Sequence, residues 1–532
     1  MAATKGGGSR RRFEKRKTRK EHESMKKTLS ILLALAMLLT LCAVPALAEE
    51  QKTLSLAWAP LTVVNQFCDW SETPFVKAWE AKTGVKLEIV NPADFSVYFA
   101  SGNYADIIYY QWNKYPGGAS KAIEDGIIIP LEDKVAEYAP DYLALLQSDK
   151  NWLNQCTTPD KHLYAFNFVR GDRRLLTSNG MFIRADWLKE LNMEIPETPD
   201  ELYNALVAFR DQKGATAPMT CTGWWMEHAL DNGMFSSAFG LVKGNYYQMD
   251  GKVHYGYSEA AYKGVLEFLH KLYDEKLLDR SYLTMDGTTL TSNMLNGISG
   301  AMLHSGGGMA GIVTTARNAG DEGFTMGALP YLVANRGEKA MGGQISSNIP
   351  GGAAAISTSC KDVETAMKFL NWGYTKEGAT LMNFGVEGES FTMVDGVETY
   401  TDLINHNPDG KTMQQALGQY TLAWHEGPFC QDINYLLQYW AMPEQQQALI
   451  AFTDNTAEET VLPTLSVPGE LTDEYSAIFS EVNTYVREQT VAFISGERSL
   501  DEFDAYLQTL KDLKVERMIE IYQLALDEFN VR

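Results

Sequence analysis

Tryptophan and tyrosine side chains gather in several short segments of this chain, each time beside polar residues. The segments are Phe67–Trp70, Tyr110–Trp112, Trp224–Trp225 and Trp424–Glu426. An indole or phenol ring covers the apolar C–H face of a sugar, while amides, carboxylates and guanidinium groups hydrogen-bond to its hydroxyls. These residue types in these combinations are compatible with a site that stacks on a saccharide, but they do not by themselves require one.

The predicted ligand-binding residues come from these segments, from the end of the first strand and from a polar turn at Ser346–Asn348. They are Trp58, Trp70, Tyr110, Trp112, Trp224, Trp225, Asn348 and Trp424. Each indole also has a second interpretation, because a ring in a loop between strand and helix often covers the core. We expect Trp112→Ala or Trp224→Ala to weaken sugar binding without unfolding the protein.

Arg173 and Arg174 lie near the first expected chain crossing and allow two interpretations. They could bind the carboxylate of a uronic acid. An ion pair with the acidic exterior is the favoured alternative.

The sequence contains no motif for covalent or metal chemistry. There is no HExxH, no GxSxG, no zinc-ligand spacing and no phosphate-binding glycine loop, so no metal, cofactor or catalytic residue is predicted. The 68 Asp and Glu make candidate carboxylate pairs unavoidable, so an exported polysaccharide-degrading enzyme remains an alternative. The five cysteines after residue 48 are widely spaced and odd in number, which leaves one or two disulfides open.

Charge and length exclude some functions. The formal net charge is −22 over 532 residues, and a surface of this sign repels nucleic acid and anionic membranes. The length predicts two domains or lobes.

The N-terminal region predicts export. An apolar run from Leu29 to Val44 follows Lys26 and Lys27 and precedes Ala46-Leu47-Ala48, the pattern of a secretory signal peptide over residues 25–48. The run is shorter than a membrane span. Leu41 is too bulky for a lipidation signal ahead of Cys42, so we expect cleavage after Ala48 and an unlipidated, extracellular or periplasmic protein with no membrane span. The basic residues 1–24 are interpreted as an upstream extension or tag, and a nucleic-acid arm is the alternative.

Hydrophobic periodicity predicts an α/β fold. Strand patterns at Leu54–Trp58 and Val85–Val90 flank a helix that begins with Thr73 and Pro74, a unit that predicts a parallel sheet. A third strand at Ile107–Tyr109 places Trp112 just beyond its carboxyl end, where open α/β sheets bind ligands.

Capping boxes predict further helices at Thr198–Glu201 and Ser499–Glu502. Apolar spacing predicts helices from Val363 to Leu370 and from Val515 to Phe529.

Several segments together resemble one family, the bacterial extracellular solute-binding proteins. They are Ala78–Val85, Ser101–Ile108, Arg184–Leu188, Ile195–Leu202, Tyr374–Gly388 and Ile494–Asp501. The closest subgroup is the long carbohydrate-binding receptors of Gram-positive ABC importers.

The resemblance implies a two-lobed, periplasmic-binding-protein-like (type II) α/β fold with a hinge and an interlobe cleft. It places residues 49–170 and 326–388 in lobe 1, and residues 171–325 and 389–532 in lobe 2. It further implies a monomer that carries an oligosaccharide to the transmembrane subunits of a permease.

The stretch Asp211–Thr216 lacks the alternating oxygen ligands of the subgroup's calcium loop, so no calcium is expected there. Other open alternatives are a peptide or another small solute as ligand, or a structural role at the cell surface.

Overall fold

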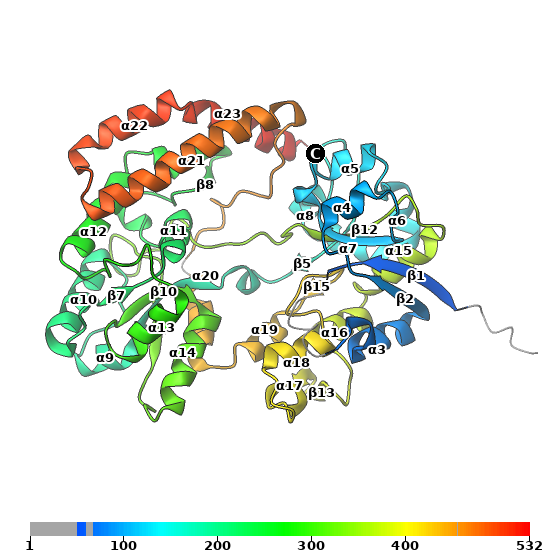
Figure 1. The fold of residues 1–532 in the computed structure, drawn as a ribbon, viewed down its shortest axis with the longest axis horizontal. Helices are drawn as coiled ribbons and strands as arrows, with labels where there is room; N and C mark the ends of the chain where they lie inside the picture. The colour runs from blue at the N-terminus through cyan, green and yellow to red at the C-terminus, as the bar shows by residue number, and fades with distance from the viewer. Residues whose placement is uncertain (1–50, 60–67, 455, 532) are drawn as a thin grey trace, which may run out of the picture. The chain divides into compact units, whose positions relative to one another are not determined.

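A computed structural model describes residues 51–59, 68–454 and 456–531. The predicted signal peptide, its cleavage point and the basic segment ahead of it lie outside the described residues. The described chain contains two mixed β-sheets with helices packed on them, together with three short two-stranded ladders (Figure 1).

The first sheet, called sheet 1, has the strand order β2-β1-β3-β12-β4. Its strands are β1 (Lys52–Ala57), β2 (Val85–Val90), β3 (Ile107–Gln111), β4 (Phe166–Asn167) and β12 (Gly352–Ile356). Strands β1 and β3 are parallel, as the strand–helix–strand pattern predicts. Strand β12 is antiparallel to β3 and β4, so the prediction of a parallel sheet is wrong for this strand.

The antiparallel direction of β12 follows from the path of the chain between the two sheets. The chain returns from the second sheet and enters β12 at the edge where β3 ends, so Gly352 at the start of β12 pairs with Gln111 at the end of β3. The ends of β1, β3 and β4 and the beginning of β12 therefore meet at one edge, called the sheet-1 edge below.

The second sheet, called sheet 2, has the order β11-β6-β10-β7. Its strands are β6 (Asn179–Arg184), β7 (Met219–Thr220), β10 (Ala301–Ser305) and β11 (Met326–Ala328). β10 runs parallel to β7 and antiparallel to β6, so Ser305 pairs with Asn179. The ends of β7 and β10 and the beginning of β6 thus share one edge, called the sheet-2 edge.

Local sequence signals set the helix limits. Helix α3 (Pro74–Thr83) ends before Gly84, which adopts φ +70°. In α10 (Pro199–Lys213) the predicted capping box is present, with Thr198 and Glu201 each bonded to the other's backbone. The helix predicted after Ser499 begins later, because Leu500–Glu502 forms a 3-10 turn and α22 (Phe503–Asp512) follows it.

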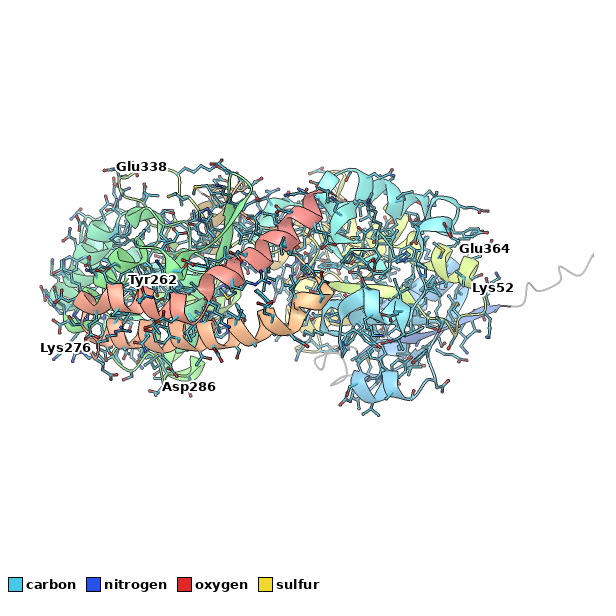
Figure 2. All side chains as sticks on the ribbon, turned by 90° about the horizontal axis from the view of Figure 1, so that it is seen from above. Lys52, Tyr262, Lys276, Asp286, Glu338 and Glu364 are labelled. Atoms are coloured by element: carbon cyan, nitrogen blue, oxygen red, sulfur yellow. The ribbon has the colours of Figure 1, made fainter. Side chains whose placement is uncertain are left out.

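Helices α21 (Thr472–Ser495), α22 and α23 (Val515–Asn530) form a C-terminal layer (Figure 1). They share one apolar core with sheet 2 and with α12 (Tyr262–Asp274). The labelled Tyr262 (Figure 2) is buried and its hydroxyl lies 2.8 Å from Thr490 Oγ1 on α21. This contact ties the layer to α12.

Other helices complete the fold. They are α4 (Phe95–Ala100), α5 (Gly118–Glu124), α6 (Glu132–Tyr138), α7 (Pro140–Gln147), α8 (Lys150–Gln155), α9 (Ala185–Glu190), α11 (Gly223–Asp231), α13 (Gly287–Leu295), α14 (Gly306–Asn318), α15 (Val363–Trp372), α16 (Lys376–Phe384), α17 (Asp402–Asn405), α18 (Met413–Tyr420), α19 (Ile433–Tyr439) and α20 (Pro443–Thr453).

Three two-stranded ladders add β8 (Tyr246–Met249) with β9 (Lys252–Tyr255), β13 (Phe391–Val394) with β14 (Val397–Tyr400), and β5 (Val169–Arg170) with β15 (Cys430–Gln431). No helix among the described residues is long and apolar enough to cross a membrane.

The predicted lobe limits stay a prediction. The strand pairings show where the chain returns from sheet 2 to sheet 1. β11 pairs with β6 in sheet 2, and β12 lies in sheet 1, so the return to sheet 1 falls between Ala328 and Gly352. The cysteines Cys68, Cys156, Cys221, Cys360 and Cys430 are all free thiols.

Candidate ligand-binding site

The sheet-2 edge presents a pair of tryptophans on a short helix. Strand β7 ends at Thr220, and Thr222 then caps α11 by accepting a hydrogen bond from Trp225 N at 3.3 Å. This cap fixes Trp224 and Trp225 in the first turn of α11, directly beyond the carboxyl end of the strand. The structure therefore brings these two predicted site residues together where α/β sheets bind ligands.

Trp224 forms a supported and accessible aromatic surface. Its ring stacks on His228, one helical turn later, with centroids 5.1 Å apart and planes 10° from parallel. His228 Nε2 lies 3.1 Å from Asn179 Nδ2 at the start of β6. Trp224 is nevertheless 60% exposed. The imidazole covers one face of the indole and Trp225 packs edge-on at 4.6 Å, which leaves the other part of the ring accessible.

A small hollow of about 10 Å³, enough for one water molecule, adjoins Trp225 and is lined by amide, imidazole, aromatic and aliphatic groups. Its lining includes Asn179, Trp225, His228, Asn232 and Gln344. The Gln344 side chain is oriented by its own hydrogen bonds, since Oε1 accepts from Ser178 N at 2.8 Å and Nε2 donates to Ser346 Oγ at 2.9 Å.

The imidazoles at this edge are held neutral. Burial lowers the pKa of His228, although nearby Asp231 opposes the shift. Burial likewise lowers the pKa of His304, whose ring lies 5.1 Å from that of Trp225. The hollow thus offers hydrogen-bonding groups and aromatic faces without a charged imidazolium.

At the sheet-1 edge, Trp58 and Trp70 lie in one aromatic group with Tyr109 and His425. The Trp58 ring stacks on Tyr109 at 4.4 Å and meets Trp70 edge-on at 4.9 Å. Trp58 and Trp70 are only 2% and 4% exposed. Their faces are covered by protein, so their predicted contact with ligand stays a prediction.

Tyr110 and Trp112 belong to a second aromatic group with Phe95 and Phe99 of α4. Tyr110 is half-buried, whereas Trp112 is fully buried and donates its indole N–H to Ala353 O at 3.1 Å. This burial contradicts the expectation that Trp112→Ala leaves the fold intact, because removing a buried indole opens a cavity.

The remaining predicted residues are half-buried. Trp424 packs against the small core around α18 and α19. Asn348 binds the backbone of Arg170 twice, with Asn348 O accepting from Arg170 N at 2.9 Å and Nδ2 donating to Arg170 O at 2.7 Å. Asn348 therefore holds the strand that carries Arg170.

Arg173 and Arg174 both have partners within the protein. Arg173 donates to Thr456 O at 2.6 Å and pairs with Glu458 at 2.8 Å, and Arg174 pairs with Asp172. The ion-pair interpretation of these two arginines is confirmed.

Five residues around these sites were absent from the prediction: Asn179, His228, His304, Gln344 and Arg170. His228 could have been found from sequence as the residue one helical turn after Trp224, and His304 as the end of an apolar strand. Nothing in the local sequence marks Asn179, Gln344 or Arg170.

No metal centre was found in the described part of the chain, where no three His, Cys, Asp or Glu side chains gather closely enough. At the stretch where calcium was considered, Asp211 pairs with Arg210 at 2.7 Å and Gly214 ends α10 with φ +74°.

Comparison with known proteins gives consistent results. The sequence profile of the family described as "Bacterial extracellular solute-binding protein" matches residues 69–380. The chain is 24% identical over 463 residues to the lipoprotein LipO of Bacillus subtilis (strain 168), covering 83% of this chain and 86% of that protein. It is 22% identical over 516 residues to the "Fructooligosaccharide ABC transporter substrate-binding protein FusA" of Streptococcus pneumoniae serotype 4, covering 90% and 91%.

A solved structure shows the same fold. The crystal structure of the alginate-binding protein AlgQ2 without calcium ion superimposes with a TM-score of 0.66 at 21% identity, covering 90% of this chain and 98% of that one. The predicted two-lobed, periplasmic-binding-protein-like α/β fold is therefore confirmed.

Proposed function

This chain belongs to the bacterial extracellular solute-binding protein family, and we propose that it is the receptor of an ABC importer that captures an oligosaccharide and delivers it to the transmembrane permease. The proposal includes export of the chain after cleavage at Ala48 and action at the cell surface, or in the periplasm if the source has an outer membrane. FusA is named for fructooligosaccharides and AlgQ2 for alginate, so two relatives with full-length similarity are named for saccharides.

One observation carries the proposal: the exposed indole of Trp224, which is stacked on His228 in the first turn of α11, just beyond the end of β7. Trp224 is 60% exposed, so its indole offers an accessible apolar face at the end of the strand, where α/β sheets bind ligands. A sugar ring matches this surface, because its C–H face can cover the exposed indole.

The mechanism needs two states of the receptor. In the open state the ligand reaches the sheet-2 edge, and in the closed state it also contacts the sheet-1 edge. Closure is stabilised only by contacts that exist in the closed state, so a ligand that binds one lobe alone does not shift the equilibrium. The permease subunits would recognise the closed form.

The proposal assigns no catalytic step. A hydrolase of saccharides needs two carboxylates on opposite sides of a glycosidic bond. In the hollow at the sheet-2 edge the lining residues are amides, imidazole, aromatic and aliphatic groups, without a carboxylate. The relatives compared above include a substrate-binding protein and an alginate-binding protein, which fits a receptor.

A thermal-shift panel tests the function. The mature chain is incubated with neutral oligosaccharides such as kestose, with alginate oligosaccharides, and with short peptides. A ligand that binds only the native state raises the melting temperature. We expect a saccharide to give the largest shift and to be recovered intact by mass spectrometry. A shift with peptides alone, or recovery of cleaved sugar, contradicts the proposal.

A further inference from the structure

Two oppositely charged residues, Arg170 and Glu426, lie at the sheet-1 edge. Arg170 is the last residue of β5, which follows β4 at its carboxyl end. Glu426 lies in the loop before β15, next to His425. Both residues are half-buried and come within reach of the same edge, where β3 ends and β12 begins.

The Glu426 carboxylate lies against the Tyr109 side chain and the backbone of Gly352. Its Oε2 lies 3.5 Å from Tyr109 Oη. A Cβ atom on Gly352 would come within 2.2 Å of Glu426 Oε2 and 2.4 Å of Tyr109 Oη, so both oxygens lie directly against the backbone at the start of β12. Gly352 is thus required for this carboxylate to occupy its position.

Arg170 is fixed through its backbone, while its guanidinium is uncommitted. Asn348 binds both the N–H and the carbonyl of Arg170. The guanidinium carbon lies 5.7 Å from the centre of the Phe168 ring. Among the described residues, the guanidinium forms no hydrogen bond and no ion pair within 4.0 Å, including with Glu426.

The backbone places the two groups at one location without an ion pair between them, because Phe168 N donates to Gly352 O at 3.2 Å and Arg170 pairs with Gln431, five residues after Glu426. Burial raises the pKa of Glu426, and Arg170 is the strongest opposing influence, ahead of Tyr109 and the exposed Lys114. Burial lowers the pKa of Arg170, and Glu426 is the strongest opposing influence on it. A water molecule or a ligand hydroxyl between the two groups would hydrogen-bond to both of them.

We propose that Arg170 and Glu426 form a subsite for an uncharged sugar residue, in which Glu426 accepts hydrogen bonds from the ligand and Arg170 donates to neighbouring hydroxyls. This inference rests on the proposed function and adds the ligand's chemical class. A carboxylate accepts from hydroxyl groups and a guanidinium offers several donors in one plane, so together they match adjacent sugar hydroxyls.

The subsite disfavours an acidic sugar residue. A uronate carboxylate could pair with Arg170, but it would then lie near the Glu426 carboxylate, and like charges at close range repel. At the sheet-2 edge, burial lowers the pKa of both His228 and His304, so these imidazoles supply no positive charge at neutral pH. Arg173 and Arg174 already pair with acidic residues.

The test uses isothermal titration calorimetry on the mature chain with kestose as the neutral probe and an alginate trisaccharide as the acidic probe. If kestose gives no thermal shift, the neutral oligosaccharide with the largest shift replaces it. The variants are Arg170→Gln, Glu426→Gln and their combination, and Lys114→Gln is the control because it removes an exposed cation at the same edge.

We expect each single variant to weaken binding of the neutral probe by a factor on the order of ten to a hundred. The double variant should weaken it by less than the product of the two factors, because both groups bind the same sugar residue. Lys114→Gln should leave this affinity unchanged, and the wild type should bind the neutral probe more tightly than the acidic one.

Distinct results separate this inference from the proposed function. If the wild type binds no saccharide of either class, the proposed function fails. Tighter binding of the alginate trisaccharide than of any neutral probe, or full affinity for the neutral probe in both single variants, overturns only the subsite. If Arg170→Gln does not fold, the affinity of Glu426→Gln for the neutral probe tests the subsite alone, because this substitution keeps the size and shape of the side chain.

Discussion

The strongest quantitative prediction concerns Trp224→Ala. An indole side chain has about 200 Å² of surface to bury. With 60% of Trp224 exposed, about 120 Å² remains accessible in the ligand-free protein, and a sugar stacked on the free face covers about half of it. At about 25 cal/mol per Å², this contact is worth about 1.5 kcal/mol, or about a tenfold change in Kd.

The same reasoning predicts a small effect on stability. About 80 Å² of the indole is already buried, mainly against His228 and Trp225, which corresponds to at most about 2 kcal/mol of unfolding free energy. Part of this loss is offset because alanine is the better helix former in the first turn of α11. The variant should therefore fold and melt within a few degrees of the wild type.

The assay is calorimetric titration with the saccharide that gives the largest thermal shift, combined with thermal melts monitored by circular dichroism. Trp224→Phe, which keeps a stacking ring, should retain most of the affinity. Leu524→Ala on α23 is the matched control, because Leu524 is an exposed apolar side chain (46%) on a helix of the C-terminal layer. Unchanged affinity in Trp224→Ala would refute the role of the indole as a stacking surface.

Two further predictions concern buried groups at the sheet-1 edge. Trp112→Ala should lower the unfolding free energy measured in urea by about 3–5 kcal/mol, because the indole is fully buried. Trp112→Phe should lower this free energy by clearly less. A Trp112→Ala variant with the stability of the wild type would contradict the buried position of the indole. Burial lowers the pKa of His425 to about 4, below its usual 6.5, so the unfolded chain takes up this proton first as the pH falls. The contribution of His425 to stability should therefore be complete above about pH 6.5 and be lost between about pH 6.5 and 4, and a His425→Phe variant should show a shallower loss of urea stability over that range.

Much of the fold could be predicted because its signals are local. The strand at Val85–Val90 has the limits that were expected, and the capping box at Thr198 and Glu201 marks the start of α10. The orientation of β12 could not be predicted in this way. It depends on where the chain re-enters sheet 1, and the residues Gly352–Ile356 are apolar throughout whichever direction they run.

The candidate site was predictable only in part, for a related reason. The type of a residue shows that it can stack on a sugar, but its exposure depends on contacts that are distant in sequence. Trp58 and Trp224 looked alike in sequence, yet Trp58 is covered by Tyr109 while Trp224 is accessible. Arg170 and Glu426 are separated by more than 250 positions along the chain, and only the fold places them at one edge.

The distribution of groups between the two edges favours a division of roles in recognition. The sheet-2 edge offers an accessible ring and uncharged amides, which suit the apolar face and the hydroxyls of a saccharide in the open receptor. The sheet-1 edge offers a charged pair that is partly desolvated, and hydrogen bonds to such charges are stronger and more demanding in geometry. Contacts that form only after closure are the ones that stabilise the closed state. Loss of Trp224 should therefore weaken capture of many saccharides to a similar degree, whereas loss of Glu426 should reduce the discrimination among them.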